Sequence, residues 1–229
     1  MFNEQQNCAR CIDAVVAILK KLPIKALLIV INDGSTDQTE KILEQKQYPT
    51  YLTILTHKKN KGYGTATVTG IKEAQKKKYP WILHMDSDLT NDPKYIKDFI
   101  KKADETVDCI KASRYIIGSD VINIPAFRKI VSIIGNSVAA LLFDIGIRDC
   151  TNGFRMIRLE KIKGLHFTQK GFSIILEELY YLKKRHAVFI EIPYTLTARK
   201  NSHSHFSYKP IVFFNYFKYS LLSFFLSKR

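Results

Sequence analysis

Two apolar segments of this chain end abruptly in acidic residues, and this feature constrains the fold most. Residues 81–85 form a short run of β-forming side chains followed by Asp86 and Asp88, and residues 26–31 form a continuous apolar run followed by Asp33. Buried strands of a parallel sheet have this composition, and their carboxyl ends meet at the edge where open α/β folds bind ligands. Aspartates spaced Asp-x-Asp can share a hard divalent cation, which can in turn hold a diphosphate. The sequence therefore predicts an α/β domain with an acidic ligand-binding edge.

Helical and strand patterns alternate along the first half of the chain, as is typical of a doubly wound sheet. We expect helices at about residues 7–21, 64–78 and 94–102, with a shorter one at 38–45, and strands at 26–31, 52–56, 81–85 and 109–112. Further along, the pattern predicts helices at 130–143 and 174–185 and a last strand at 188–192.

A formal net charge of +15 sets the chain apart from ordinary globular domains and implies an anionic partner. Nucleic acid, a phosphorylated ligand and an acidic membrane surface all fit this charge. Arg128 and Lys129 stand at the start of a predicted helix, where the helix dipole disfavours cations. A bound anion would explain them, and so would chance in a basic protein. The four cysteines make no disulfide framework, which suits a reducing compartment.

The segment 211–226 is apolar and aromatic nearly all round, and it is shorter than the roughly 20 residues that a membrane-spanning helix needs. We expect it to lie in a membrane interface or to dock on a partner, with a buried terminal helix as the alternative.

The pair Gly62-x-Gly64 stands before the helix predicted to end near residue 78. A dinucleotide fingerprint would need a third glycine where Thr67 stands. The pair instead predicts a tight strand-to-helix turn that lets the backbone approach a ligand.

Several short motifs in fixed order resemble those of family 2 glycosyltransferases of the polyprenyl-phosphate sugar synthase type, the group that includes dolichol-phosphate mannose synthases. The resemblance covers nearly the whole chain. It runs through Phe2-Asn3-Glu4, Asp33-Gly34-Ser35, Lys61 to Ala66, Asp86-Ser87-Asp88, Ser113-Arg114-Tyr115, Gly153-Phe154-Arg155, Glu177, and Glu191-Ile192-Pro193 with Arg199 beyond.

The resemblance implies a GT-A fold, an α/β architecture with a doubly wound mixed sheet that binds a nucleotide-diphosphate sugar. It implies that a hexosyl residue passes with inversion to a polyprenyl phosphate such as dolichyl or undecaprenyl phosphate, with Mg²⁺ or Mn²⁺ as cofactor. The residues that it assigns are Asn3, Glu4, Asp33, Gly62 and Asp86 for the nucleotide sugar, Asp86 and Asp88 for the metal, and Arg114, Arg128 and Ser132 for the acceptor phosphate. Asp86, Asp88, Arg114 and Arg128 would form the catalytic set.

In domain terms, the resemblance implies a glycosyltransferase domain over residues 1–209 and a membrane-interface helix over 210–229. The protein would then associate peripherally with the cytoplasmic face of a membrane and would not bind nucleic acid.

The chain departs from the family pattern at three places. Thr90 stands where the family often has a metal-binding glutamine, and residues 202–207 replace a Gly-x-Ser-Lys segment. The apolar strand that normally leads into Phe2 is also missing. We therefore expect either a coding start further upstream or an altered sheet in which the strands ending at Asp33 and near Asp88 pair directly.

Two other functions compete with lipid-phosphate glycosyl transfer. A family 2 enzyme that elongates a glycan on a hydroxyl acceptor would need a general base, for which Glu177 or Glu178 would serve. A binding module at a membrane or on nucleic acid would explain the net charge alone. The sequence does not name the sugar, the nucleotide or the lipid.

Overall fold

The computed structural model describes residues 1–197 and 210–226, and these form an α/β fold with a mixed sheet. In the first half the elements are α1 (Cys8–Leu19), β1 (Leu28–Asn32), α2 (Thr39–Glu44), β2 (Leu52–Thr56), α3 (Tyr63–Lys76), β3 (Trp81–His84), the 3₁₀ turn η1 (Pro93–Tyr95), α4 (Ile96–Lys102) and β4 (Cys109–Ser113). In the second half they are β5 (Asp120–Ile122), α5 (Ala126–Phe143), β6 (Arg155–Arg158), α6 (Leu159–Ile162), α7 (Ile174–Lys184), β7 (Phe189–Pro193), β8 (Thr195–Thr197) and α8 (Pro210–Leu226).

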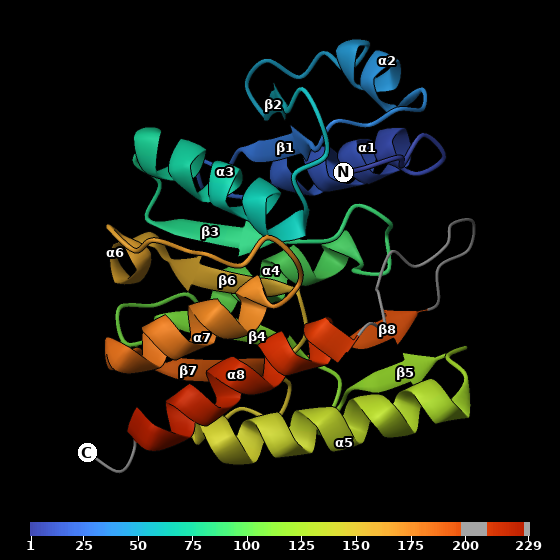
Figure 1. Ribbon diagram of the computed structural model, residues 1–229. Coiled ribbons are helices and arrows are strands. Elements are labelled where there is room, and N and C mark those ends of the chain that lie inside the picture. The colour runs from blue at the N-terminus through green and yellow to red at the C-terminus, as the bar shows by residue number, and fades with distance from the viewer. Residues whose placement is uncertain (198–209, 227–229) are drawn as a thin grey trace.

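The main sheet has the order β3-β6-β4-β7, in which β6 runs antiparallel to both neighbours and β4 runs parallel to β7. Two further pairs of parallel strands stand beside it, β1 with β2 and β5 with β8. The predicted mixed α/β sheet is thus confirmed, but it is divided (Figure 1).

The expectation that the strands ending at Asp33 and near Asp88 pair directly is wrong. Within the described residues, β1 is paired only with β2, and β3 only with β6. A cavity lies between the facing edges of β1 and β3, and residues of α1 and α3 also line it.

Helices cover both faces of the main sheet. Neighbouring side chains on each strand point to opposite faces, so one strand packs against helices on both sides. On one face, Ile110 of β4 packs with Phe99 of α4. On the other face, Cys109 of β4 packs with Ile71 of α3 and Leu182 of α7. β4 is therefore held by a core on each side.

Helix α5 is longer than predicted and starts at Ala126, directly after Pro125. It lies along α8 at the edge of the molecule (Figure 1), and Phe143 of α5 packs with Tyr219 of α8. Helix α8 also packs on α7. The terminal helix is thus docked on the domain along one side, while Phe214, Phe217 and Phe225 remain exposed.

Candidate active site

The two aspartates that follow β3 lie at its carboxyl end, as predicted. The backbone N–H of Asp86 donates to Oδ1 of Asn91 (2.9 Å), and Asn91 in turn donates to the hydroxyl of Tyr194 (3.1 Å). Oδ1 of Asp88 accepts from the amide and the hydroxyl of Thr90, at 3.0 and 2.7 Å. Thr90 therefore fixes the side chain of Asp88.

A second loop lies directly against the Asp86 carboxylate. A Cβ atom on Gly153 would stand 3.6 Å from both Asp86 oxygens and 3.1 Å from the hydroxyl of Tyr63. The contact with Asp86 would be an ordinary one, whereas the contact with Tyr63 would be tight, so the glycine of the Gly153-Phe154-Arg155 motif gives the loop room beside Tyr63. The same loop begins at Asp149, which pairs with the predicted acceptor residue Arg114.

The chemistry of this edge fits a divalent cation held jointly with a ligand. Among the described residues no group of three or more His, Cys, Asp or Glu side chains is placed to hold a metal. A cation here would take Asp86 and Asp88 from the chain and its other oxygens from water and a bound diphosphate. Mg²⁺ is commonly held in this way, by one or two carboxylates together with substrate phosphates.

Asp33 is buried after β1 and holds the loop that leads into α3. Its carboxylate accepts from the backbone N–H groups of Lys61 (3.0 Å) and Gly62 (2.8 Å), and it lies 2.6 Å from Nδ1 of His57. The other ring nitrogen of His57 is 3.0 Å from the hydroxyl of Thr69. Both Asp33 oxygens thus organise the glycine turn.

The tight turn at Gly62 and Gly64 is confirmed, but the chain approaches its own backbone there. A Cβ atom on Gly62 would lie 2.5 Å from the carbonyl oxygen of Lys170, and one on Gly64 would lie 2.1 Å from that of Gln169. Gly62 also has a φ of 94°, in the region that favours glycine. The glycines are therefore required by the segment before α7, whatever ligand binds nearby.

Asn3 and Glu4 lie beside the end of β1 and are tied to the segment that leads into α2. Oδ1 of Asn3 accepts from the backbone N–H of Thr36 (2.8 Å), and the Asn3 N–H donates to Ser35 (3.1 Å). The Glu4 N–H donates to the hydroxyl of Thr39 (2.9 Å). These bonds bring Asn3 and Glu4 to the same sheet edge as Asp33.

The predicted acceptor residues Arg114 and Ser132 belong to one polar network. Arg114 makes a two-pronged ion pair with Asp149 (2.7 and 2.8 Å), and it also donates to Thr151 (3.0 Å). Burial opposes the charged form of Arg114, yet Asp149 outweighs burial and raises the pKa of Arg114 above its ordinary value. Arg114 is therefore a cation throughout the physiological range.

Thr151 connects this ion pair to α5. Its hydroxyl accepts from Nδ2 of Asn136 (2.9 Å), and its N–H donates to Oδ1 of Asn136 (3.1 Å). One turn earlier, the hydroxyl of Ser132 lies 2.7 Å from that of Tyr115. Arg128 is a further turn earlier on the same helix and is exposed.

Sequence reasoning missed Asp149, Thr151 and Asn136, which hold Arg114 in place. The sequence shows a polar loop from Asp149 and a polar Asn136 within the predicted helix 130–143, but neither indicates a partner for Arg114. Arg114 and Asp149 are 35 residues apart in the chain, so no local spacing could pair them.

The two carboxylates considered as general bases are both fully buried, which corrects that alternative. Glu177 accepts from the backbone and hydroxyl of Thr168, from the N–H of Gln169 and from the hydroxyl of Tyr219. Glu178 pairs with the buried Arg155 at 2.5 Å. Neither faces a space where an acceptor hydroxyl could reach it, so both stabilise the fold. Arg199 and residues 202–207 lie outside the described residues.

Comparison with known proteins assigns the chain to a family. The model of the family described as Glycosyl transferase family 2 matches residues 1–165. The chain belongs to glycosyl transferase family 2. It is 29% identical over 216 residues to a dolichol-phosphate mannosyltransferase of Pyrococcus furiosus, with 92% of this chain covered, and it spans 58% of that relative's length. It is 26% identical over 204 residues to a polyprenol monophosphomannose synthase of Mycolicibacterium smegmatis, which covers 87% of this chain and 76% of the relative.

Solved structures of this fold agree with the family. Glucosyl-3-phosphoglycerate synthase from Mycobacterium tuberculosis in complex with UDP superposes with a TM-score of 0.67 at 16% identity, over 97% of this chain and 77% of that one. The same enzyme in complex with Mn²⁺ and UDP-glucose gives a TM-score of 0.65 at 17% identity, over 100% and 76%. The likeness shows that the fold is that of GT-A glycosyltransferases.

Proposed function

We propose that this chain transfers a hexosyl residue from a nucleotide-diphosphate sugar to a polyprenyl phosphate, with inversion at the sugar carbon and with Mg²⁺ or Mn²⁺ at Asp86 and Asp88. The names of the two relatives support the acceptor class, and the Mn²⁺ and UDP-glucose complex of the structural neighbour supports the donor class.

One observation carries the proposal: the loop from Asp149 to Gly153 joins the two halves of the site. At one end Asp149 and Thr151 bind Arg114, and at the other end Gly153 lies against the Asp86 carboxylate. The Arg114–Asp149 ion pair and the acidic edge proposed to hold the cation thus meet across a single short loop. Transfer of a sugar from a diphosphate to a phosphate needs this combination, because both reactants are anions.

The chemistry assigns a role to each group. A cation at Asp86 and Asp88 would act as a Lewis acid that stabilises the leaving nucleoside diphosphate. Arg128 and Arg114 would bind and orient the acceptor phosphate, and Ser132 would donate to it. The acceptor is already an anionic nucleophile, so no general base is required and catalysis consists of positioning and charge neutralisation. A single displacement inverts the sugar carbon.

A lipid acceptor is supported by the outer face of α5, which carries a stripe of exposed apolar side chains. Phe127 is 76% exposed, Ile134 59% and Leu141 76%. Residues at these spacings share one side of a helix, so the stripe runs along its whole length. By length and composition alone, residues 126–143 would also be apolar enough to cross a membrane. We propose that α5 lies on a membrane surface with Arg128 at its first turn, on the cytoplasmic face, and that exposed phenylalanines of α8 extend this surface.

The proposal is tested by incubating the protein with a panel of nucleotide sugars, Mg²⁺ or Mn²⁺, and a polyprenyl phosphate, and by scoring sugar that becomes extractable into organic solvent. Transfer of one sugar, abolished by a metal chelator, is expected. Transfer only to free glycans or only to water would overturn the acceptor assignment.

Arg128→Ala provides the sharper test of the acceptor half. Because Arg128 is exposed on α5, its removal costs little stability, whereas a charge-assisted contact to phosphate is worth about 1.5–3 kcal/mol. The KM for polyprenyl phosphate should rise about ten- to a hundredfold, with the KM for nucleotide sugar nearly unchanged. Lys129→Ala is the matched control, since it removes an equal charge from the next exposed residue. Equal effects of the two variants would contradict a specific phosphate contact.

A further inference from the structure

Two buried cations, Arg155 of β6 and Lys111 of β4, lie within the main sheet and take no part in the proposed transfer. Both side chains are fully buried, and the two residues stand opposite each other in the antiparallel register of β4 and β6. Like charges at opposed positions of neighbouring strands destabilise a sheet. Burial lowers the pKa of Lys111 below its ordinary value, and the charge of Arg155 lowers it further. Packing alone therefore does not account for this pair of cations.

Both cations donate to backbone carbonyls of the loop that joins the two halves of the site. The ammonium of Lys111 donates to the carbonyls of Cys150 (3.2 Å) and Asn152 (2.8 Å). Nη1 of Arg155 donates to the carbonyl of Gly153 (2.7 Å). Three carbonyls of this short loop are thus bonded to buried cations that belong to the rigid sheet.

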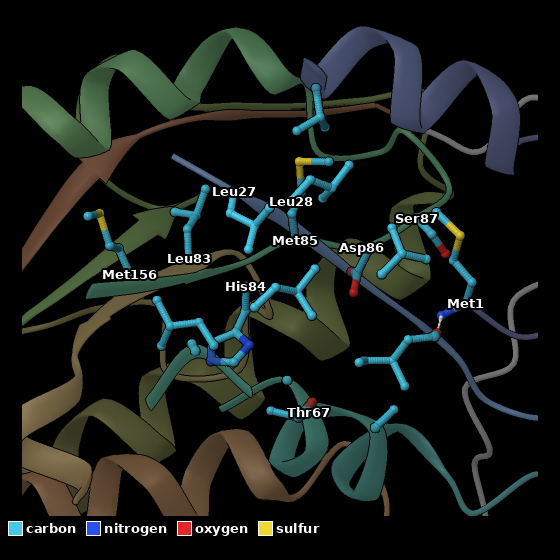
Figure 2. Close-up of a pocket in the computed structure, with 18 of the residues that line it drawn as sticks. Met1, Leu27, Leu28, Thr67, Leu83, His84, Met85, Asp86, Ser87 and Met156 are labelled. Carbon is cyan, nitrogen blue, oxygen red and sulfur yellow. Dashed lines mark hydrogen bonds between the residues drawn. The ribbon is translucent and has the colours of Figure 1, made fainter. Parts of the chain in front are cut away.

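Arg155 lies on the same side of the sheet as the acidic edge. His84 is opposite Arg155 in the register of β3 and β6, so the two side chains share a face. Figure 2 shows the side chains of His84 and Asp86 pointing to the same side, toward Thr67 of α3. Gly153, to which Arg155 donates, is also the residue that lies against the Asp86 carboxylate. Arg155 therefore supports the loop at the place where the loop meets Asp86.

An ion pair with Glu178 of α7 fixes the guanidinium of Arg155. Its Nε lies 2.5 Å from Oε2 of Glu178, whose charge outweighs burial and raises the pKa of Arg155 above its ordinary value. In the described part of the chain, Nη2 of Arg155 and Oε1 of Glu178 have no hydrogen-bond partner. A buried ion pair of this kind is often no more stabilising than apolar side chains of similar volume. What it does provide is a donor held at a fixed point below the carbonyl of Gly153.

We propose that Arg155 is a positioning residue for the transfer reaction. Its guanidinium, fixed by Glu178, holds the carbonyl of Gly153 so that the loop keeps its place beside Asp86. Lys111 holds the earlier part of the loop in the same way. The effect on catalysis rests on the proposed function, whereas the effect on the loop itself does not. Because Arg155 contacts the loop rather than the acceptor, its loss should lower kcat more than it weakens acceptor binding.

The test compares three variants of the full chain. Arg155→Met leaves Glu178 buried without its partner, so Tm should fall by about 6 °C or more. Arg155→Met combined with Glu178→Leu replaces the ion pair by apolar side chains of similar size and should regain most of that loss. Arg158→Met is the matched control, because it removes an arginine and its ion pair with Asp108 from the other end of β6.

Both variants of Arg155 should lower kcat by about tenfold or more, because a displacement of about 1 Å can slow a reaction about a hundredfold. The KM for polyprenyl phosphate should stay within a few fold of wild type, unlike that of Arg128→Ala. In the ligand-free protein, amides in a peptide covering residues 149–154 should exchange about tenfold faster in the double variant. Arg158→Met should leave both kcat and this exchange nearly unchanged. Lys111→Met should also lower kcat and speed exchange, and it decides the matter if neither variant of Arg155 folds.

Recovery of kcat together with Tm in the double variant would overturn the proposal, because support of the fold would then be the whole role of Arg155. Loop exchange that matches wild type in both the double variant and Lys111→Met would overturn it as well. A wild type that transfers no sugar, with faster loop exchange in these variants, would count against the proposed function and leave the support of the loop by Arg155 and Lys111 standing.

Discussion

At the scale of single residues, Asp88 is the most direct test of the acidic edge. Its Oδ1 is held by both donors of Thr90, so the carboxylate is fixed before any cation arrives. Asp88→Ala removes a proposed metal ligand at a strand end, and transfer should fall by about a thousandfold or more, which corresponds to several kcal/mol of transition-state stabilisation. Initial rates at saturating Mg²⁺ or Mn²⁺ measure this loss.

Asp92→Ala is the matched control, because this carboxylate follows in the same loop and its side chain is 49% exposed. It caps η1 by accepting from the N–H of Lys94, so its loss should cost about 1 kcal/mol of stability and leave the rate within a few fold of wild type. An Asp88→Ala variant that performs like Asp92→Ala would refute the metal-ligand role.

His84 gives the fold a pH dependence that can be measured without substrate. Burial lowers its pKa well below the ordinary value of 6.5, and the nearby cations Arg155 and Lys111 lower it further. The unfolded chain therefore takes up a proton near pH 6.5 that the folded chain refuses. The stability tied to neutral His84 is fully present above that pH and is lost as pH falls below it.

Urea unfolding between pH 7.5 and 5.5 should show the wild type losing up to about 1.4 kcal/mol per pH unit more than His84→Gln. The difference between the two proteins isolates His84, because they share all other titrating groups. Parallel stability curves for the two proteins would mean that His84 is protonated equally in the folded and unfolded states.

At the scale of elements, the outer stripe of α5 should control membrane binding. Ile134→Gln with Leu141→Gln removes two exposed apolar side chains without touching the buried side, where Asn136 and Phe143 pack. Cosedimentation with anionic liposomes should fall about tenfold or more, because each buried large apolar side chain contributes about 1.5–3 kcal/mol. Ile117→Gln is the control, since Ile117 is 99% exposed and lies outside the helix.

Deleting α8 would be a poorer test, because this helix also supports the domain. Tyr219 donates to the buried Glu177, and Ser223 is fully buried. The terminal segment was predicted to lie in a membrane interface or to be buried, and the structure gives it one docked side and one exposed side. Its all-round apolar composition could not separate these two outcomes, because both need apolar residues.

Sequence patterns predicted the elements whose apolar residues repeat regularly and missed those stabilised by distant polar partners. The strand β6 was not predicted, because it begins with Arg155 and ends with Arg158. Arg155 is buried because it pairs with Glu178 and donates to the carbonyl of Gly153, and the Arg158 guanidinium stacks on Trp81 at 4.5 Å. The strands β5 and β8 were not predicted, because each has only three residues.

The site residues show the same contrast between local patterns and distant partners. Asp86 and Asp88 could be placed from the strand before them, whereas the pairing of Arg114 with Asp149 depends on tertiary structure.

At the scale of the whole molecule, the division of the sheet should give its two parts different local stabilities. β4 lies inside the main sheet, bonded on both edges and covered by helices on both faces. β1 and β2 form a separate two-stranded sheet, and one edge of β1 borders the cavity. Two-stranded sheets are marginally stable by themselves, and local opening exposes amides that the main sheet protects.

Native-state hydrogen exchange should therefore show the amides of β1 and β2 opening at a free energy about 2 kcal/mol or more below those of β4. Mass spectrometry of peptides that cover Leu28–Asn32 and Cys109–Ser113 resolves the two regions in one sample. Binding of a nucleotide-diphosphate sugar with Mg²⁺ or Mn²⁺ should narrow the difference, because Asp33 at the end of β1 and Asp86 at the end of β3 would then contact one ligand. Equal protection of the two regions in the ligand-free protein would mean that α1 and α3 alone couple the divided sheet into one cooperative unit.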